Sequence, residues 1–372
     1  MALRALVIGT GWAAEGHVLG LRHAGAKVVG LYGRNAEIAA QLAARLGVER
    51  LGQDWRGAIT ELAPDVVAIA TTAAPHLEMA EAAAAAGCHI ACEKPLALTA
   101  ADARARRDAV VAAGVRHACA ATAALSPAIT YAVALIRQGA IGRVRHAEKT
   151  THLVPRPDQP YSWWHRLADG GGILYNGFPH VLQTLVRITG GAVRDATGTT
   201  SQALQRAPVG PQHHDHRAAR ADAVDLQRAD VHWRDADTET GFQALLRLRL
   251  PDASVATATI ATVFGHAAGK PGLLVHGTEG TLLAEEATHT VELTRDGSDW
   301  ESVMVPEHLF SDDGEGDKVQ RGWNRYLTRF VRDIEGLASE DDDYPTFDDG
   351  YVTCQVIDTV RAGGAVTEID GT

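Results

Sequence analysis

Lys94 is the side chain in this sequence with the clearest chemical potential. It stands in the tripeptide Glu93-Lys94-Pro95, directly after the apolar run 89–92, which predicts a buried strand. The carboxyl ends of parallel strands border the crevice in which doubly wound sheets bind their cofactors. An ammonium group at that edge can hydrogen-bond a reacting oxygen and stabilise the charge that develops on it. A tripeptide of this kind can also form a surface turn. The other motifs of the chain distinguish these two interpretations.

Asn176 and His180 form a second candidate constellation, six and ten residues after the first of three glycines at 170–172. From Ile173 onward the pattern predicts a helix that places both side chains on one face. Such a pair could hold a substrate oxygen and move its proton. A purely structural histidine is the alternative. We expect nearby side chains to contact the substrate, with ordinary packing as the alternative: Tyr161, Trp163, Trp164, Arg166 and Tyr175.

A glycine turn at 9–14 follows the first apolar run and precedes a helical pattern, as a dinucleotide-binding fingerprint requires. Gly9 allows the tight turn, and Gly11 lets the backbone approach a pyrophosphate on the helix N-terminus. A plain connection between strand and helix is the alternative. The predicted cofactor contacts of this turn are Gly9, Thr10, Gly11, Trp12 and Ala13.

The end of the second predicted strand bears on the choice of cofactor. Many NAD-binding domains have a carboxylate there for the adenosine ribose, but this chain has Gly33-Arg34-Asn35. A 2′-phosphate is attracted by a guanidinium and repelled by a carboxylate. We therefore expect NADP(H) to be preferred, with NAD(H) possible, and Arg34 to contact the phosphate. A solvent-exposed arginine at a helix start is the alternative.

These candidate sites require two kinds of sheet. Apolar runs alternate with alanine-rich helical patterns up to about residue 122, which predicts a parallel, doubly wound sheet. Residues 123–372 instead carry alternating runs, which predict an open, mostly antiparallel sheet with one covered face. The sequence thus predicts an α/β protein with a Rossmann domain at 1–122 and an α+β substrate and oligomerisation domain at 123–372. Part of the polar stretch 205–237 is read as an insertion or loop.

Bulk properties exclude several classes of function. A formal charge of −11 over 372 residues, with no basic stripe, argues against nucleic-acid binding. No run is long and apolar enough to span a bilayer, and no leader precedes the first strand, so we expect a cytoplasmic protein. The four cysteines lack metal spacing and suit buried thiols. The polar run 213–216, with three histidines, is read as a solvated loop, and no metal site is expected.

Taken in order, the motifs resemble the glucose–fructose oxidoreductase, inositol dehydrogenase and rhizopine-catabolism group (Gfo/Idh/MocA). The resemblance rests on the segments 9–11, 71–76, 92–96 and 170–180, with support from the tail at 323–358. It implies a Rossmann domain followed by a domain whose open sheet forms a homodimer or homotetramer interface. It also implies a small sugar, cyclitol or related cyclic substrate. The further cofactor contacts it implies are Thr71, Thr72, His76, Glu93, Lys94 and Pro95.

The resemblance also assigns roles. It implies that Lys94 and His180 are catalytic, and it places an asparagine, Asn176, where the family usually has an aspartate. Asparagine forms hydrogen bonds but cannot take a proton. Ala123 and Ala124 stand where many relatives carry an arginine or an aromatic residue. Both departures bear on which substrate is bound.

The expected chemistry is hydride transfer between NADP(H) and a carbonyl or imine carbon. Lys94 would stabilise the oxygen, His180 would move the proton, and Asn176 would orient the substrate. Two alternatives remain open. One is transient oxidation with elimination or hydrolysis of a sugar group and no net redox change. The other is a ligand-sensing regulator without catalysis. The sequence leaves the substrate, the direction of the reaction and the oligomeric state open.

Overall fold

The computed structural model describes residues 2–154, 156–211, 213, 216–265, 272–339 and 342–369. The first domain is built on a parallel sheet of six strands in the order β3-β2-β1-β4-β5-β6. Its strands are β1 (Arg4–Ile8), β2 (Lys27–Tyr32), β3 (Leu51–Gly52), β4 (Val66–Ile69), β5 (His89–Cys92) and β6 (His117–Cys119). Its helices are α1 (Trp12–His23), α2 (Ala36–Leu46), α3 (Trp55–Leu62), α4 (His76–Ala85) and α5 (Ala100–Ala113). The predicted Rossmann sheet is confirmed.

The second domain carries a nine-stranded sheet in the order β16-β15-β14-β13-β7-β12-β11-β8-β17. Among the strand pairs of this sheet in the described residues, only β7 and β12 run parallel. The strands are β7 (Val144–Leu153), β8 (Ala192–Ser201), β11 (Gly241–Arg249), β12 (Val255–Phe264), β13 (Leu273–Gly277), β14 (Thr281–Glu285), β15 (Thr290–Thr294), β16 (Glu301–Val303) and β17 (Thr367–Glu368). The mostly antiparallel sheet is confirmed.

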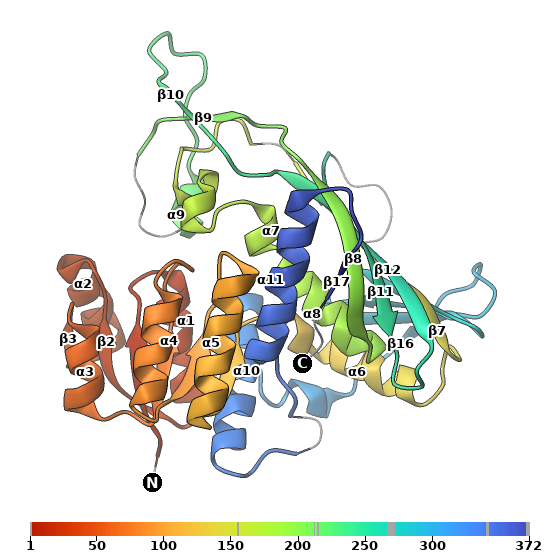
Figure 1. The fold of residues 1–372 in the computed structure, drawn as a ribbon, viewed down its shortest axis with the longest axis horizontal. Coiled ribbons are helices and arrows are strands. Elements are labelled where there is room, and N and C mark those ends of the chain that lie inside the picture. The colour runs from red at the N-terminus through yellow and green to blue at the C-terminus, as the bar shows by residue number, and fades with distance from the viewer. Residues whose placement is uncertain are drawn as a thin grey trace.

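One face of this sheet is covered and the other is open. In β11 every second side chain from Phe242 to Leu248 is buried, whereas Leu245, which points the opposite way, is 56% exposed. This alternation is the pattern of a sheet with one solvated face. The covered face lies against α6 (Pro127–Arg137), α8 (Phe178–Thr189) and α11 (Phe347–Ala362), which Figure 1 shows on one side of the sheet.

Two late helices return to the Rossmann domain. α10 (Lys318–Ile334) packs along α1 so closely that a methyl group on Gly16 would lie 2.0 Å from Cε3 of Trp323. α11 lies between α5 and the second sheet (Figure 1). The two domains are therefore joined by packed helices as well as by the crossing of the chain. No helix among the described residues is long and apolar enough to cross a membrane.

The described residues of the polar stretch 205–237 include regular secondary structure. It forms the two-stranded ribbon β9 (Arg206–Pro208) and β10 (Trp233–Asp235) and the short helix α9 (His216–Ala221). Figure 1 shows α9 on the same side as the carboxyl edge of the Rossmann sheet, although it belongs to the second domain. We call residues 205–237 the excursion.

Candidate active site

The turn between β1 and α1 has the geometry of a dinucleotide cradle. Gly9 has a φ of +140°, and a Cβ there would lie 2.2 Å from the carbonyl oxygen of Ala70, so only glycine fits. A Cβ on Gly11 would meet no heavy atom within 4 Å. α1 begins at Trp12, so free backbone N–H groups of its first turn face this open space. The turn therefore fits a bound pyrophosphate.

The surroundings of Gly33 at the end of β2 explain why no carboxylate is present there. A Cβ on Gly33 would lie 2.4 Å from Cγ2 of Thr10, so an aspartate at position 33 would collide with the dinucleotide turn. Arg34 is exposed at the adjacent position. Asn35 caps α2, because its Oδ1 accepts a hydrogen bond of 3.1 Å from the Ile38 N–H. Of this predicted group, Arg34 alone keeps an exposed cationic side chain at the strand end.

His76 lies beneath the strand ends. Its Nε2 is 3.2 Å from the carbonyl oxygen of Thr71, and its Nδ1 is 3.4 Å from that of Leu96. The ring is completely buried, and burial together with the neighbouring Arg106 lowers its pKa to about 4. The neutral ring thus ties the 71–76 segment to the 92–96 segment. Thr71 and Thr72 are partly exposed at the crevice.

Glu93 is directed into the protein. Its Oε1 accepts hydrogen bonds from His17 Nε2 at 3.2 Å and Trp323 Nε1 at 2.9 Å. Burial alone would raise its pKa, but the hydrogen bond and charge of His17, the charge of Lys94 and the bond from Trp323 lower it to about 2. The buried carboxylate therefore connects β5 to α1 and α10 and fixes the backbone that carries Lys94.

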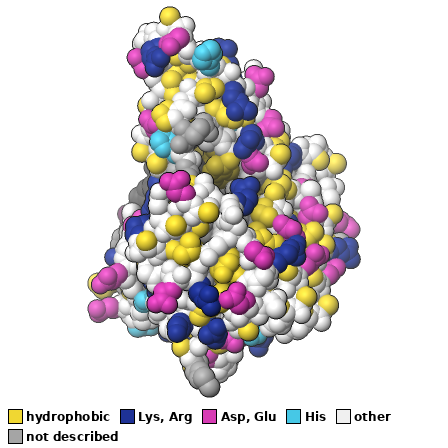
Figure 2. Space-filling view, turned by 90° about the vertical axis from the view of Figure 1, so that its left-hand side faces the viewer, with side chains coloured by type: hydrophobic (Ala, Val, Ile, Leu, Met, Phe, Trp, Pro, Cys, Tyr) yellow, Lys and Arg dark blue, Asp and Glu magenta, His cyan; other side chains and the backbone are white. Residues whose placement is uncertain are grey.

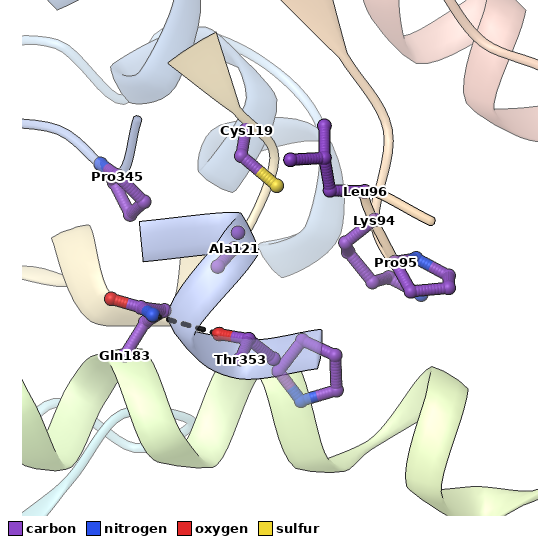
Figure 3. Close-up of a pocket in the computed structure, with 10 residues that line it drawn as sticks. Lys94, Pro95, Leu96, Cys119, Ala121, Gln183, Pro345 and Thr353 are labelled. Atoms are coloured by element: carbon purple, nitrogen blue, oxygen red, sulfur yellow. Dashed lines mark hydrogen bonds between the residues drawn. The ribbon is translucent and has the colours of Figure 1, made fainter. Parts of the chain in front are cut away.

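Lys94 stands at the junction of the two domains. Burial lowers its pKa, while the charge of Glu93 opposes that shift. Figure 3 shows the enclosed side of the junction, where Lys94 and Cys119 of the first domain and Gln183 of α8 line a cavity of about 10 Å³. This volume is at the lower limit for one water molecule. The cavity is too small for a substrate, which must approach Lys94 from the crevice.

His180 brings the second domain to Lys94. It lies in the first turn of α8, and burial followed by the charge of Lys94 lowers its pKa to about 3, with a further contribution from Lys149 of β7. Its Nδ1 is buried and has no hydrogen-bond partner among the described residues. The imidazole is therefore neutral at physiological pH, with one buried ring nitrogen that has no partner among the described residues. Lys94 lines the same small cavity as Pro179, the neighbour of His180, so both predicted catalytic residues lie at the junction of the two domains.

The single helix predicted from Ile173 onward is wrong. The structure has α7 (Ile173–Asn176) and α8 (Phe178–Thr189), separated at Gly177. Pro179 has no N–H to bond the carbonyl four residues earlier, so the helical ladder is interrupted between Asn176 and His180. Gly177 itself keeps right-handed helical dihedral angles, with φ −97° and ψ −45°, and its N–H donates to the Ile173 carbonyl at 2.7 Å, so the interruption is local.

Asn176 holds the glycine segment. Its Nδ2 donates to the carbonyl oxygens of Gly170 at 3.0 Å and Gly172 at 2.7 Å. An aspartate would present carboxylate oxygens to those carbonyls and could make neither bond. The asparagine therefore suits the conformation of this segment, and its carbonyl oxygen is the atom left for a substrate.

Glu239 is a site residue that the sequence reasoning missed. Its Oε1 accepts from the Leu174 N–H at 2.9 Å, and its other oxygen lies 3.4 Å from Arg361. A Cβ on Gly172 would lie 2.5 Å from the same Oε1. The buried carboxylate thus stabilises the N-terminus of α7. No local motif marks it, because its partners are about 65 and 122 residues distant in the chain.

The predicted substrate residues fall into two groups. Tyr175 is buried at the domain junction, donates from its hydroxyl to the Leu98 carbonyl at 2.5 Å, and carries the Arg361 guanidinium 4.3 Å above its ring. Tyr161 is also buried and stacks on His165 at 5.4 Å.

The remaining three candidates are more open. Trp163 and Trp164 meet edge to face at 5.8 Å and are partly exposed. Arg166 is paired with Asp169. The two tryptophans are therefore the better placed of the predicted aromatic contacts.

A metal site finds no support in the described part of the chain, where no group of three or more His, Cys, Asp or Glu side chains converges. His213 pairs with Asp222 at 2.7 Å. His214 and Asp215 of the same run lie outside the described residues. All four cysteines are buried free thiols, as expected.

Comparison with known families gives two matches in chain order. Residues 3–120 match an oxidoreductase family with an NAD-binding Rossmann fold, and residues 129–283 match the GFO/IDH/MocA C-terminal domain. The matches leave out the return helices α10 and α11.

Individual proteins are similar over part or all of the chain. A levoglucosan dehydrogenase of Pseudarthrobacter phenanthrenivorans is 36% identical over 152 residues, which are 40% of this chain and 39% of that protein. A D-apiose dehydrogenase of Paraburkholderia graminis is 36% identical over 137 residues, 37% of this chain and 36% of that protein. These alignments span well under two thirds of either relative. A levoglucosan dehydrogenase in complex with NADH and L-sorbose has a TM-score of 0.80 at 23% identity and covers 99% of both chains, which shows a shared fold.

Proposed function

The chain belongs to the Gfo/Idh/MocA oxidoreductase family, and from that premise we propose that it transfers hydride between a nicotinamide cofactor and a small cyclic substrate. The proposal is carried by the position of Lys94 at the domain junction, where it lines one cavity with Pro179, the neighbour of His180. The turn that fits a pyrophosphate, at Gly9 and Gly11, lies in the same Rossmann domain. The reacting carbon is a carbonyl or alcohol carbon, or an imine or amine carbon.

Lys94 and His180 have different roles at the substrate oxygen. Lys94 hydrogen-bonds that oxygen and stabilises the negative charge on it, in surroundings where burial already lowers the pKa of the lysine. His180 is neutral, so it accepts the hydroxyl proton when an alcohol is oxidised. Asn176 orients the substrate through its carbonyl oxygen. The cofactor, when bound, supplies or accepts the hydride.

We propose a sugar, a cyclitol or a related compound as the substrate. The names of the two partial relatives, which refer to levoglucosan and D-apiose, support this class. Trp163 and Trp164 offer partly exposed aromatic surface suited to the apolar face of such a ring.

NADP(H) preference is a separate proposal, and it rests on Arg34. The guanidinium is exposed beside Gly33, where the contact with Thr10 leaves no room for a carboxylate. A 2′-phosphate at this position would meet a cation and no anion. We expect Arg34→Ala to lower kcat/KM for NADPH by about tenfold and to leave NADH unchanged.

Association through the open sheet face is proposed as well. Leu245 and Val255 are 56% and 43% exposed on that face, and a second copy of the chain would cover them. A homodimer or homotetramer would form in this way. Sedimentation of the wild type and of a Leu245→Glu variant tests it, and a wild-type monomer would contradict it.

The test of the function is an activity panel. Oxidation of NADH and NADPH is followed with ketosugars, inososes, aryl ketones and cyclic imines, and reduction of NAD⁺ and NADP⁺ with the matching alcohols and amines. Turnover of at least one sugar-class compound with net cofactor consumption supports the proposal. Cofactor binding without net consumption on any substrate would instead support chemistry with transient oxidation, and failure to bind either cofactor would contradict both.

A further inference from the structure

A second cavity lies beside the last turn of α8. Its volume is about 260 Å³, and it is enclosed by α6, α8, the short helix η4 (Glu307–Phe310) and the segment before α11. The described residues that line it are Thr130, Tyr131, Val133, Ala134, Arg137, Gln138, Arg187, Pro306, His308, Leu309 and Asp343. Because a cavity of about 150 Å³ already holds benzene, this one has room for a six-membered ring with a substituent.

This cavity is separate from the crevice of the proposed reaction. The crevice opens between the Rossmann domain and the projecting strands β9 and β10 of the excursion, where Figure 2 shows the surface hollowed. Figure 1 shows α6 at the other end of the molecule from β9 and β10. No described residue lines both this cavity and the small cavity at Lys94. A molecule bound here would therefore be a further ligand, in addition to cofactor and substrate.

The charged groups of the wall favour an anion. Asp343 is the only acidic side chain among the described lining residues, and Arg187 binds both of its oxygens, at 3.0 and 2.6 Å. Arg187 also donates to the Thr130 hydroxyl at 3.1 Å, which fixes the guanidinium in the wall. Arg137 adds a second positive charge. The described lining thus has two arginines and one aspartate, and the aspartate is already paired.

Arg137 is the group that a ligand can bind. It is the last residue of α6 and is exposed. The carbonyl groups at 134–136 accept hydrogen bonds from the backbone N–H groups at 138–140, so this helix end is closed without the arginine side chain. The guanidinium has no hydrogen bond or ion pair among the described residues. Its attraction to the helix dipole leaves its N–H donors free for a carboxylate, which a guanidinium binds through two parallel bonds.

The rest of the wall suits an apolar ring. Val133, Ala134, Pro306 and Leu309 contribute aliphatic carbon to the lining, and Tyr131 contributes an aromatic ring. Sites for small molecules commonly combine such a lining with a few polar groups that fix the orientation of the ligand. A ring in contact with this wall could direct a carboxylate toward the mouth of the cavity.

We propose that this cavity is a binding site for a small organic acid, whose carboxylate pairs with Arg137 and whose single ring packs against the apolar wall. The inference goes beyond the proposed hydride transfer and does not rest on it. It gives the second domain a ligand of its own, held between α6, α8 and η4.

Titration of the full-length protein with benzoate tests the inference, with the methyl NMR signals of Val133 and Leu309 as the readout. We expect both signals to shift until the site is saturated. Benzamide has the same shape without the charge, so it should bind at least about tenfold more weakly. The absence of a saturable shift with benzoate, or equal affinity for benzamide, would overturn the inference.

Three variants test the residues of the site. Arg137→Ala should raise the dissociation constant of benzoate about tenfold. Ala134→Leu fills part of the cavity and keeps the arginine, so it should weaken binding at least as much. Arg50→Ala is the matched control, because it removes an arginine that is 64% exposed on the Rossmann domain, and it should bind benzoate as wild type does. Equal affinity in Arg137→Ala and Arg50→Ala, or unchanged binding in Ala134→Leu, would contradict the site.

A last variant separates this site from the crevice. Lys94→Ala should bind benzoate as tightly as wild type does, with the same shifts at Val133 and Leu309. Loss of benzoate binding in Lys94→Ala, together with its retention in Arg137→Ala, would place the anion in the crevice and overturn the inference. Failure of the wild type to bind NADH and NADPH would contradict the proposed function and leave this result unaffected.

Discussion

At the scale of single residues, the charge of Lys94 in the first domain acts on His180 in the second. The lysine contributes to the low pKa of the histidine, after burial. Lys149 adds to the same effect and is held by Glu286, whose Oε1 is 2.6 Å from its Nζ. A neutral imidazole can accept a hydrogen bond from a substrate hydroxyl, but a pKa of about 3 makes it a weak base. Transfer of the proton to His180 therefore depends on the stabilisation of the oxygen by Lys94.

Lys149→Met tests this electrostatic description of His180. The loss of one nearby positive charge should raise the pKa of His180 from about 3, because the protonated ring is then repelled less. The titration of His180 by NMR measures the shift. Lys318→Met, which removes a lysine at the start of α10, serves as the control. An identical His180 titration in wild type and Lys149→Met would contradict the assigned cause.

Asn176→Asp tests the reason for the asparagine. The variant loses both hydrogen bonds to the glycine carbonyls and brings a charge toward them, so the free energy of unfolding at neutral pH should fall by about 1–3 kcal/mol. Urea unfolding at neutral and mildly acidic pH measures it. The difference from wild type should shrink in acid, where the aspartic acid is protonated and can donate. Wild-type stability at neutral pH would mean that Asn176 does not hold the segment.

At the scale of elements, two glycines at the start of α1 and within it have different structural roles. Gly11 leaves space at the N-terminus of the helix, whereas Gly16 lets Trp323 of α10 approach. Trp323 in turn donates to Glu93, whose backbone carries Lys94. The packing of two helices and the placement of the proposed catalytic lysine are thereby connected.

Alanine substitutions at Gly16 and at Gly11 test these two roles separately. Gly16→Ala forces its methyl group into the Trp323 ring, so it should lower the free energy of unfolding by about 1–3 kcal/mol. Gly11→Ala should preserve stability and weaken NADH binding, because its methyl group enters the space meant for the pyrophosphate. Urea unfolding measures the free energy of unfolding of both variants, and fluorescence titration measures their affinity for NADH. Equal stability of the two variants would contradict the proposed packing constraint.

At the scale of the whole molecule, acid should destabilise the fold. The folded pKa is about 2 for Glu93, about 3 for His180 and about 4 for His76, and each lies below the ordinary value of its group. The unfolded chain therefore binds more protons, so stability is fully present above about pH 6.5 and falls as the pH drops toward 2. The completely buried His76 contributes about 2 kcal/mol of the loss between pH 7 and pH 5.

The slope of stability against pH provides the measurement. Urea unfolding at pH 7 and pH 5 should show the loss in wild type and a smaller loss in His76→Gln, whatever the absolute stability of the variant. A slope that the substitution leaves unchanged would mean that His76 is not held neutral in the folded protein.

The sequence predicted the parts of this structure that depend on local patterns. The apolar run 89–92 forms the strand β5, and the alternation of apolar and alanine-rich segments gives the six-stranded parallel sheet, so both were located correctly. The break at Gly177, the partners of Glu239 and the contact of Arg217 with Trp12 were not predicted. Each depends on contacts between residues that are far apart in the chain. The periodicity of the sequence does not indicate such contacts.

The candidate site likewise combines features that local sequence patterns predict with features that depend on tertiary packing. Lys94 could be placed at the edge of the sheet because the end of the strand β5 is a local feature, whereas the role of His180 was implied by the family resemblance. The direction of the Glu93 carboxylate could not, since its partners His17 and Trp323 are 76 and 230 residues away.

Lys94→Ala tests the central claim most directly, with transfer of deuterium from [4-²H]NADPH or [4-²H]NADH to the best substrate of the activity panel as the readout. The account predicts that the variant binds the cofactor as tightly as wild type and loses transfer by at least about a thousandfold, because the charge on the oxygen is no longer stabilised. Transfer at the wild-type rate by a folded, cofactor-bound Lys94→Ala protein would contradict it.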